Sequence, residues 1–315
     1  MKSNYLIIGS RSSKLALVQA RYAADKLKRS YPEFDFQIKT IKTVGDKIQD
    51  VALSKIGDKG LFTKEIEEAL LRQEVDLAVH SMKDLPTELP LGLIVAAVTK
   101  REDPCDVLVS KQGFTLKTLP TGSKIGTSSL RRSAQLLHIR RDLNILDLRG
   151  NLDTRIKKLE QGAYDAIILA YAGIKRLGFK PKLSRIPLDD MLPQAGQGAL
   201  GIEIRKDALE VADLVEALDD PDSHLSIDAE RALLAGLEGG CQVPIGVYAL
   251  VGKIKISIKA GVFSLDGKSA VKDEITGNKK DAKALGRQLA ERILKKKIAR
   301  KILDDVKKSK RRDLC

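Results

Sequence analysis

The chain has 315 residues, of which 43% are hydrophobic and 31% are charged. This length and balance predict a folded protein of about two or three domains and exclude a disordered chain. No apolar run reaches the length that a bilayer-spanning helix needs, and the apolar segment at residues 5–8 is too short for a signal peptide. We therefore expect a cytosolic protein that makes no use of a membrane.

A formal net charge of +14 favours an anionic partner, and nucleic acid is the first class to consider. Aromatic residues make up only 4% of the chain and tryptophan is absent, so platforms for stacking bases are scarce. Much of the positive charge lies in the tail after residue 294, which we interpret as the solvated face of a final helix that frays. The charge distribution therefore argues against nucleic acid.

The cysteines and histidines indicate neither disulfides nor a metal. The three cysteines are widely spaced, which fits neither a disulfide framework nor a zinc site, so we expect free thiols. The three histidines show no metal-ligand spacing, and we predict no structural metal.

The first 200 residues alternate between strand-like and helix-like patterns, in two sets of similar size. In the first set we predict strands at 5–8, 36–43, 77–80 and 93–98, and helices at 14–28 and 63–71. In the second set we predict strands at 124–126, 145–147 and 166–170, and helices at 129–138, 154–161 and 172–177. Strands separated by helices predict largely parallel sheets and an α/β fold.

Two segments, 101–104 and 193–200, look like crossings between these units. Gly196 and Gly198 permit backbone angles that other residues avoid, and the residues alone leave open whether they form a hinge or an ordinary loop. From residue 208 we predict a smaller third α/β unit, with helices to about 218, at 225–237 and at 280–296, and strands at 247–250 and 254–263. The expected domains are 1–100 with 198–218, 101–197, and 219–315.

Arginine, hydroxyl and glycine residues gather at three places where a predicted strand leads into a helix. These are residues 9–13, 126–132 and 148–151. Backbone N–H groups at a helix start favour carboxylate or phosphate, and arginine there is better explained by a bound anion than by capping. Because ligands collect at the carboxyl ends of strands in α/β sheets, these side chains are expected to line one cleft; scattered surface arginines are the alternative.

Two further residues are candidates for chemistry. Asp84 comes directly after Lys83, beyond the end of a predicted strand. A carboxylate there is suited to act as counter-ion or proton acceptor for a developing cation. The alternative is an aspartate that only forms a turn near a proline. Cys241 lies between paired glycines and a proline, which is typical of a presented residue, although a lone cysteine is more often an apolar filler. No neighbouring histidine or acid marks Cys241 as a hydrolytic nucleophile.

Four segments together carry a family resemblance: VHSMKDLP at 79–86, GTSSLRR at 126–132, LRGN at 148–151 and EGGCQVP at 238–244. In order and spacing they closely resemble the hydroxymethylbilane synthases, also called porphobilinogen deaminases, and the likeness extends from Arg11 to Gly246. The resemblance implies two lobes like those of type II periplasmic binding proteins, joined by a hinge, and a smaller α/β C-terminal domain. It also implies a monomeric transferase of heme biosynthesis.

The family likeness implies a dipyrromethane cofactor attached to Cys241 by a thioether. Four porphobilinogen molecules are added to it in turn, each with loss of ammonia, and water then releases linear hydroxymethylbilane. Each pyrrole carries an acetate and a propionate, which arginine forks hold in bidentate fashion.

Site residues follow from matching positions in these motifs. The implied cofactor-binding set is Cys241, Asp84, Lys83, Ser81, Thr127, Ser128, Ser129, Arg131, Arg132 and Gly150. The implied substrate-binding set is Arg11, Ser13, Lys59, Arg149, Arg155 and Arg176. Asp84 is the implied catalytic residue, placed by pyrrole nitrogens to stabilise the cationic azafulvene formed when ammonia leaves and to assist deprotonation after the new bond forms.

The sequence departs from the family pattern at two positions. Asp58 stands where the family usually has glycine, which makes the role of Lys59 less certain, and Cys105 stands where arginine is common. The residues leave two rival functions open. The first is an anion-binding protein without chemistry, which predicts an unmodified Cys241. The second is a nucleic-acid binder, which predicts affinity that falls steeply with salt.

Overall fold

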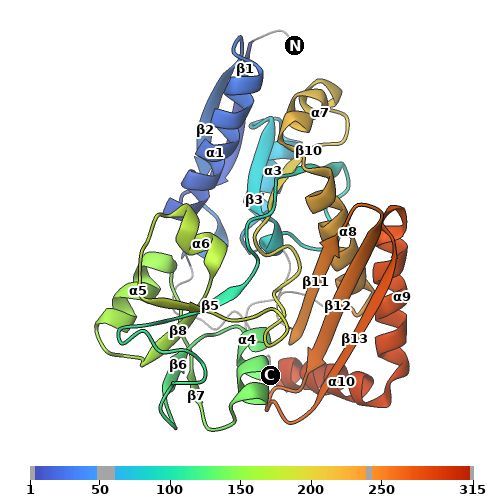
Figure 1. Ribbon diagram of the computed structural model, residues 1–315. Helices are drawn as coiled ribbons and strands as arrows, with labels where there is room; N and C mark the ends of the chain where they lie inside the picture. The colour runs from blue at the N-terminus through green and yellow to red at the C-terminus, as the bar shows by residue number, and fades with distance from the viewer. Residues whose placement is uncertain (1–3, 48–60, 239–242, 313–315) are drawn as a thin grey trace.

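Three β-sheets organise the computed structural model, which describes residues 4–47, 61–238 and 243–312 (Figure 1). The first sheet has the order β2-β1-β3-β10-β4, and its strands are Asp35–Ile41, Tyr5–Arg11, Leu77–Ser81, Leu200–Arg205 and Leu93–Val98. The second has the order β7-β6-β8-β5-β9, with strands Asn144–Leu146, Lys124–Gly126, Ala166–Ala170, Asp106–Ser110 and Leu183–Arg185. The third is an antiparallel meander of β11, β12 and β13, at Ile245–Val251, Lys255–Phe263 and Ala270–Asn278.

Helices cover these sheets, and most lie within a few residues of their predicted ranges. In the first unit they are α1, α2, α3 and the 3-10 turn η2, at Lys14–Ser30, Val44–Lys47, Lys64–Leu71 and Met82–Asp84. In the second they are α4, α5 and α6, at Leu130–Ile139, Leu152–Glu160 and Tyr171–Arg176. The remaining helical segments are α7, η3, α8, η4, α9 and α10, at Leu209–Val215, Glu216–Leu218, Pro221–Gly236, Lys279–Asp281, Ala282–Lys295 and Lys297–Arg312. The expected α/β class, with a smaller C-terminal unit, is confirmed.

The predicted strands of the first two sheets all run parallel to one another within their sheet, as expected, and each sheet also contains one antiparallel strand that was not predicted. The pairs β1–β2, β1–β3, β6–β7 and β6–β8 are parallel, but β10 runs antiparallel to β3 and β4, and β5 runs antiparallel to β8 and β9. Strands β5, β9, β10 and β13 were not predicted. Every residue of β5 and all but the last of β10 are buried, so these strands lack the alternating pattern that marks a half-exposed strand.

The two crossing segments lie side by side between the first and second sheets. Thr99 donates its backbone N–H to Leu200 and Glu102 donates to Gly198. Gly196 and Gly198 have φ of 78° and 96°, the left-handed region that favours glycine. A Cβ atom on Gly198 would collide with the carbonyl oxygen of Glu102. The left-handed backbone expected here is present, and hinge motion stays a prediction.

The basic tail does not fray, and it is not an extension of the preceding helix. Residues 297–312 form α10, a separate helix at the foot of the third sheet in Figure 1. Four of its apolar residues are buried, Ala299, Ile302, Leu303 and Val306. The basic residues Lys297, Arg300, Lys301, Lys307 and Lys308 are exposed, so the helix is amphipathic. In the described ranges, no helix is long and apolar enough to span a membrane.

Candidate active site

The first part of the site lies at the carboxyl ends of β1 and β3. Arg11 ends β1, while Ser81 ends β3 and leads into η2, which carries Lys83 and Asp84. Because these two strands are neighbours and parallel, their ends meet at one edge of the sheet. Arg11, Ser13, Ser81 and Asp84 together line a small cavity of about 60 Å³.

Contacts around this cavity fix its polar side chains. The guanidinium carbon of Arg11 lies 4.2 Å from the centre of the Phe62 ring, a cation–π contact. Gln19 Nε2 donates to Ser81 Oγ at 2.9 Å. Ser13 Oγ accepts from the N–H of Ala16 and thereby caps α1.

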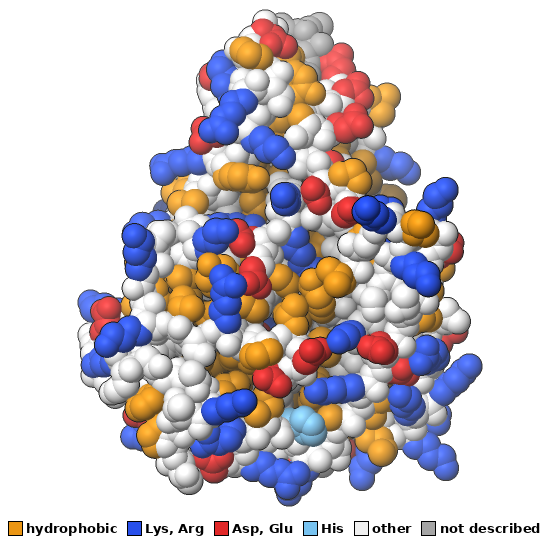
Figure 2. Space-filling model, in the orientation of Figure 1, with side chains coloured by type: hydrophobic (Ala, Val, Ile, Leu, Met, Phe, Trp, Pro, Cys, Tyr) orange, Lys and Arg blue, Asp and Glu red, His pale blue; other side chains and the backbone are white. Residues whose placement is uncertain are grey.

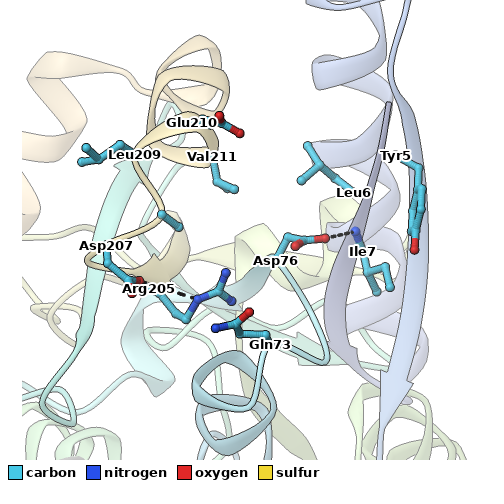
Figure 3. A pocket seen from close by; sticks show the side chains of 11 residues that line it. Tyr5, Leu6, Ile7, Gln73, Asp76, Arg205, Asp207, Leu209, Glu210 and Val211 are labelled. Atoms are coloured by element: carbon cyan, nitrogen blue, oxygen red, sulfur yellow. Dashed lines mark hydrogen bonds and ion pairs between the residues drawn. The ribbon is translucent and has the colours of Figure 1, made fainter. Parts of the chain in front are cut away.

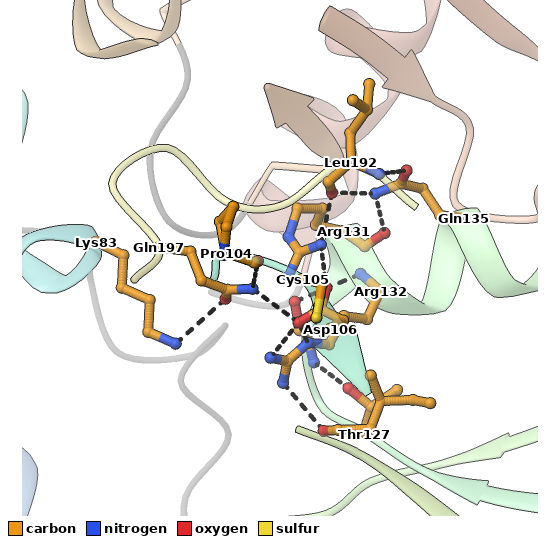
Figure 4. Close-up of polar contacts among 12 residues, drawn as sticks. Lys83, Pro104, Cys105, Asp106, Thr127, Arg131, Arg132, Gln135, Leu192 and Gln197 are labelled. Atoms are coloured by element: carbon orange, nitrogen blue, oxygen red, sulfur yellow. Dashed lines mark hydrogen bonds and ion pairs between the residues drawn. The ribbon is translucent and has the colours of Figure 1, made fainter. Parts of the chain in front are cut away.

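The second part is a buried network centred on Asp106, at the start of β5 (Figure 4). Arg131 Nη1 lies 2.7 Å from Asp106 Oδ2, and Arg132 Nη2 and Nε lie 2.7 and 3.1 Å from Oδ1. Both arginines belong to the first turn of α4, which Ser129 caps by accepting from the N–H of Arg132. Burial alone would raise the pKa of Asp106, but the charges of the two arginines lower it far below its usual range.

Lys83 joins the two parts through Gln197. Its Nζ lies 3.4 Å from Gln197 Oε1, and Gln197 Nε2 donates to Asp106 Oδ1 at 3.0 Å, as Figure 4 shows. Burial lowers the pKa of Lys83 to about 8, and the neighbouring Asp84 carboxylate opposes that shift. Lys83 therefore lies within electrostatic range of Asp84, Arg131 and Arg132.

Arg155 belongs to the same group of charges. Its pKa is lowered to about 10, first by burial and also by the charges of Arg132 and Arg149, and the Asp84 carboxylate opposes that shift. Arg155 Nε donates to the carbonyl of Gly150 at 2.8 Å, and Gly150 has a φ of 104°. The structure thus brings together cationic side chains from both sheets, around Asp84.

The other sequence-predicted residues have these positions. Arg176 lies against the crossing segment, where its Nη2 donates to the carbonyl of Gly198 at 2.6 Å. Thr127 Oγ1 accepts from the N–H of Ser129, and Ser128 Oγ donates to the carbonyl of Leu148. Cys241, Lys59 and Asp58 lie outside the described residues.

A larger cavity, of about 460 Å³, lies near the amino end of β1, whereas Arg11 lies at its carboxyl end (Figure 3). Its polar groups are engaged in structural bonds. Asp76 Oδ2 accepts from the N–H of Ile7 at 2.7 Å, and Arg205 Nη1 donates to the carbonyls of Leu70 and Val75 at 3.0 and 3.3 Å. We therefore place the chemistry at the smaller cavity, which Arg11 and Asp84 line together.

One buried donor of the cluster has no partner in the described residues and is suited to a ligand carboxylate. Arg131 Nε is buried and has no hydrogen-bond partner among the described residues. A buried donor of this kind is costly unless an acceptor meets it, and a ligand carboxylate is such an acceptor. The donors present therefore fit a ligand that carries several carboxylates.

Comparison with known proteins decides the family. Residues 6–213 match the family described as "Porphobilinogen deaminase, dipyromethane cofactor binding domain", and residues 224–295 match "Porphobilinogen deaminase, C-terminal domain". The porphobilinogen deaminase of Pelotomaculum thermopropionicum is 52% identical, over 92% of this chain and 93% of its own length. That of Chlorobaculum tepidum is 50% identical, over 97% of this chain and 99% of its own length.

The chain belongs to the porphobilinogen deaminase family. It is thus a transferase of tetrapyrrole biosynthesis with a dipyrromethane cofactor-binding domain, as expected. Similar solved structures include the methionine binding protein MetQ, with 13% identity, a TM-score of 0.43 and coverage of 70% of this chain and 92% of that one. Another is the aliphatic sulphonate binding protein SsuA from Escherichia coli, with 16% identity, a TM-score of 0.38 and coverage of 75% and 71%.

The sequence does not predict that two residues, Asp106 and Gln197, contact the cations of the candidate site. Asp106 is a single acid ahead of the apolar run Val107–Val109, a position where a buried charge needs a cationic partner. The apolar run is the sequence signal that could have identified Asp106 as a buried, paired acid. Gln197 was seen only as part of a crossing, and its side-chain contacts depend on how that crossing folds.

Proposed function

We propose that the protein condenses four porphobilinogen molecules head to tail on a dipyrromethane cofactor carried by Cys241, and that water then releases linear hydroxymethylbilane. Each condensation releases one ammonia. The observation that best supports this function is the position of Asp84. Its side chain lines the same cavity as Arg11 and interacts electrostatically with both Lys83 and Arg155. This arrangement supplies one carboxylate for a developing cation and several cations for the acid groups of the pyrroles.

The buried cations are suited to hold the cofactor. We assign its carboxylates to Lys83, Arg131 and Arg132, with hydroxyl and backbone support from Ser81, Thr127, Ser128, Ser129 and Gly150. When bound, the cofactor supplies the pyrrole end that is extended. Arg131 Nε, which lacks a partner in the described residues, is a donor suited to one of these carboxylates.

The remaining arginines are suited to the incoming substrate. We assign the acetate and propionate of porphobilinogen to Arg11, Arg149, Arg155 and Arg176, with Ser13 and Lys59. Arg11 is held in place by the Phe62 ring, so its guanidinium is oriented before substrate arrives. Arg155 is oriented in the same way by its bond to the carbonyl of Gly150.

Asp84 stabilises the positive charge that develops on porphobilinogen as its carbon–nitrogen bond breaks, and it accepts the proton that is lost after the new bond forms. Lys83 and Arg155 both interact electrostatically with this carboxylate. Replacement by asparagine keeps the shape of the side chain and removes its charge.

We also propose the division into domains at 1–100 with 198–218, 101–197, and 219–315. The membership of β10 in the first sheet supports the return of the chain to the first domain. As the family likeness implies, we propose a monomer that works in the cytoplasm. On the face shown in Figure 2, Lys and Arg side chains are scattered among Asp and Glu, which does not favour a nucleic-acid stripe.

The test is to incubate the purified protein with porphobilinogen and to measure ammonia and hydroxymethylbilane together. We expect four ammonia molecules for each product molecule, and a rate lower by about a hundredfold or more in the Asp84→Asn variant. Leu209→Ala, at an exposed site on α7, is the control and is expected to keep the wild-type rate. Turnover near the wild-type rate in Asp84→Asn would overturn the role of Asp84, and absence of ammonia release from the wild type would overturn the function.

A further inference from the structure

We infer that Asp106 is a positioning residue, whose carboxylate fixes Arg131 and Arg132 in the orientation that receives the carboxylates of the cofactor. The inference rests on the proposed function and extends it to a residue that is not expected to touch cofactor or substrate. Asp106 is fully buried and lies at the start of β5, whereas the arginines lie on α4.

The geometry around Asp106 leaves the two guanidiniums little freedom. Arg132 directs Nε and Nη2 at a single oxygen, Oδ1, and its Nη1 donates to the carbonyl of Ile168 at 3.1 Å. Arg131 uses Nη1 twice, toward Asp106 Oδ2 and toward the carbonyl of Leu192, each at 2.7 Å. Each arginine is therefore held by the carboxylate and by a backbone carbonyl, and Nε of Arg131 is left for another acceptor.

The charges give Asp106 a second effect. Arg131 and Arg132 are adjacent, buried and at the amino end of α4, where the helix dipole is positive, so their burial is unfavourable without a counter-ion. Burial lowers the pKa of Arg131, and Asp106 opposes that shift. The carboxylate thus keeps two like charges close together in the absence of any ligand.

Asp106 also reaches the lysine of the site. Gln197 Nε2 donates to Asp106 Oδ1 at 3.0 Å and to the carbonyl of Pro104 at 2.7 Å, while its Oε1 faces Lys83 Nζ at 3.4 Å. One buried carboxylate therefore orients donors that come from α4, from the crossing and, through Gln197, from η2. Loss of its charge is expected to disorder the cofactor subsite before it affects the chemistry at Asp84.

The test compares Asp106→Asn and Asp106→Glu with the wild type, each made in cells that lack porphobilinogen so that the protein is unloaded. Loading is followed by intact mass after porphobilinogen is added, at several concentrations, and each melting temperature is measured first. Asp273→Asn is the matched control, because Asp273 is also held by two cations, Arg292 at 2.6 Å and Lys296 at 3.0 Å, but lies in the third sheet.

We expect Asp106→Asn to load about tenfold more slowly at low porphobilinogen, with the difference shrinking at saturation, because the variant loses orientation and not the reactive groups. Asp106→Glu, which keeps the charge but displaces it by one methylene, is expected to load at an intermediate rate, and Asp273→Asn at the wild-type rate. All rates are compared at a temperature where each variant is folded.

Wild-type loading by Asp106→Asn would overturn the inference and leave the proposed function standing. If Asp106→Asn does not fold, Asp106→Glu decides, and its loading at the wild-type rate would overturn the inference. Failure of the wild type itself to load would instead overturn the proposed function. An equal loss in Asp273→Asn would show a general effect of removing an acid that is paired with two cations, which also contradicts the inference.

Discussion

At the scale of single residues, the charge of Lys83 is sensitive to pH just above neutrality. Its pKa is lowered to about 8, first by burial, and Asp84 opposes the shift. A lysine with a lowered pKa is charged below that value and loses its charge as the pH rises through it. A cofactor carboxylate beside Lys83 stabilises the charged form, so binding and charge favour each other.

The loss of the Lys83 charge at high pH leads to a prediction for Lys83→Arg. Arginine stays protonated throughout the accessible pH range, so the ratio of the variant's loading rate to that of the wild type is expected to rise as the pH increases from 7 to 9.5. The ratio removes effects common to both proteins, such as ionisation of the attacking thiol. Intact mass after timed exposure to porphobilinogen measures it, and a ratio that stays constant with pH would contradict the role assigned to Lys83.

The sequence predicts the charged residues of the candidate site better than it predicts their surroundings. Arg131, Arg132 and Asp84 stand out because they follow strand ends, where ligands collect in α/β folds. Asp106 does not, because its contacts join residues that are 25 and 26 positions apart and no local pattern encodes them. Ser13 and Ser129 look like ligand groups and prove to cap helices, a role that the same residue types serve equally well.

At the scale of elements, the crossing segments carry a tight backbone constraint at Gly198. We predict that Gly198→Ala lowers the free energy of unfolding by roughly 1–3 kcal/mol, since alanine at this φ is strained and its Cβ meets the carbonyl of Glu102. Gly122→Ala is the matched control: Gly122 has a φ of 76°, but no atom lies within 4 Å of its added Cβ. Urea unfolding measures both. Equal losses would mean that the close approach at Gly198 costs nothing.

Local patterns locate the helices and the parallel strands, and they fail for β5 and β10. Helix α4 combines a serine cap with an apolar face, signals that lie within the element itself. By contrast, β5 and β10 are short and buried on both faces, so their sequences resemble any apolar run, and their antiparallel pairing depends on where the crossings lead the chain. The mixed character of both sheets therefore follows from tertiary structure.

At the scale of the whole molecule, Glu230 on α8 ties the two crossings to the third sheet. Its carboxylate pairs with both terminal nitrogens of Arg101, at 2.6 and 3.1 Å. It also accepts from the N–H groups of Gly196 and Ala249, at 2.8 and 2.9 Å. A buried pair with every oxygen engaged fixes relative positions, so the third unit is attached to the segments that join the first two.

We predict that Glu230→Gln destabilises the protein by roughly 3–5 kcal/mol, because Arg101 is left buried without its counter-ion. The melting temperature and the urea midpoint measure the loss. Glu74→Gln is the control, because Glu74 pairs with Lys39 and Arg72 at the surface, and its free energy of unfolding is expected to stay close to that of the wild type. A similar small effect in both variants would show that the Glu230 link does not stabilise the fold.

The proposed function requires that Cys241 carries a cofactor built from substrate and that the buried cations hold its carboxylates. The most direct measurement is the intact mass of the purified protein and of a Cys241→Ser variant, before and after incubation with porphobilinogen. We expect the wild type, at the latest after incubation, to carry at least the extra mass of two linked pyrrole units, and the variant to carry none. An unmodified wild-type mass after incubation, or the same gain in the variant, would contradict the account.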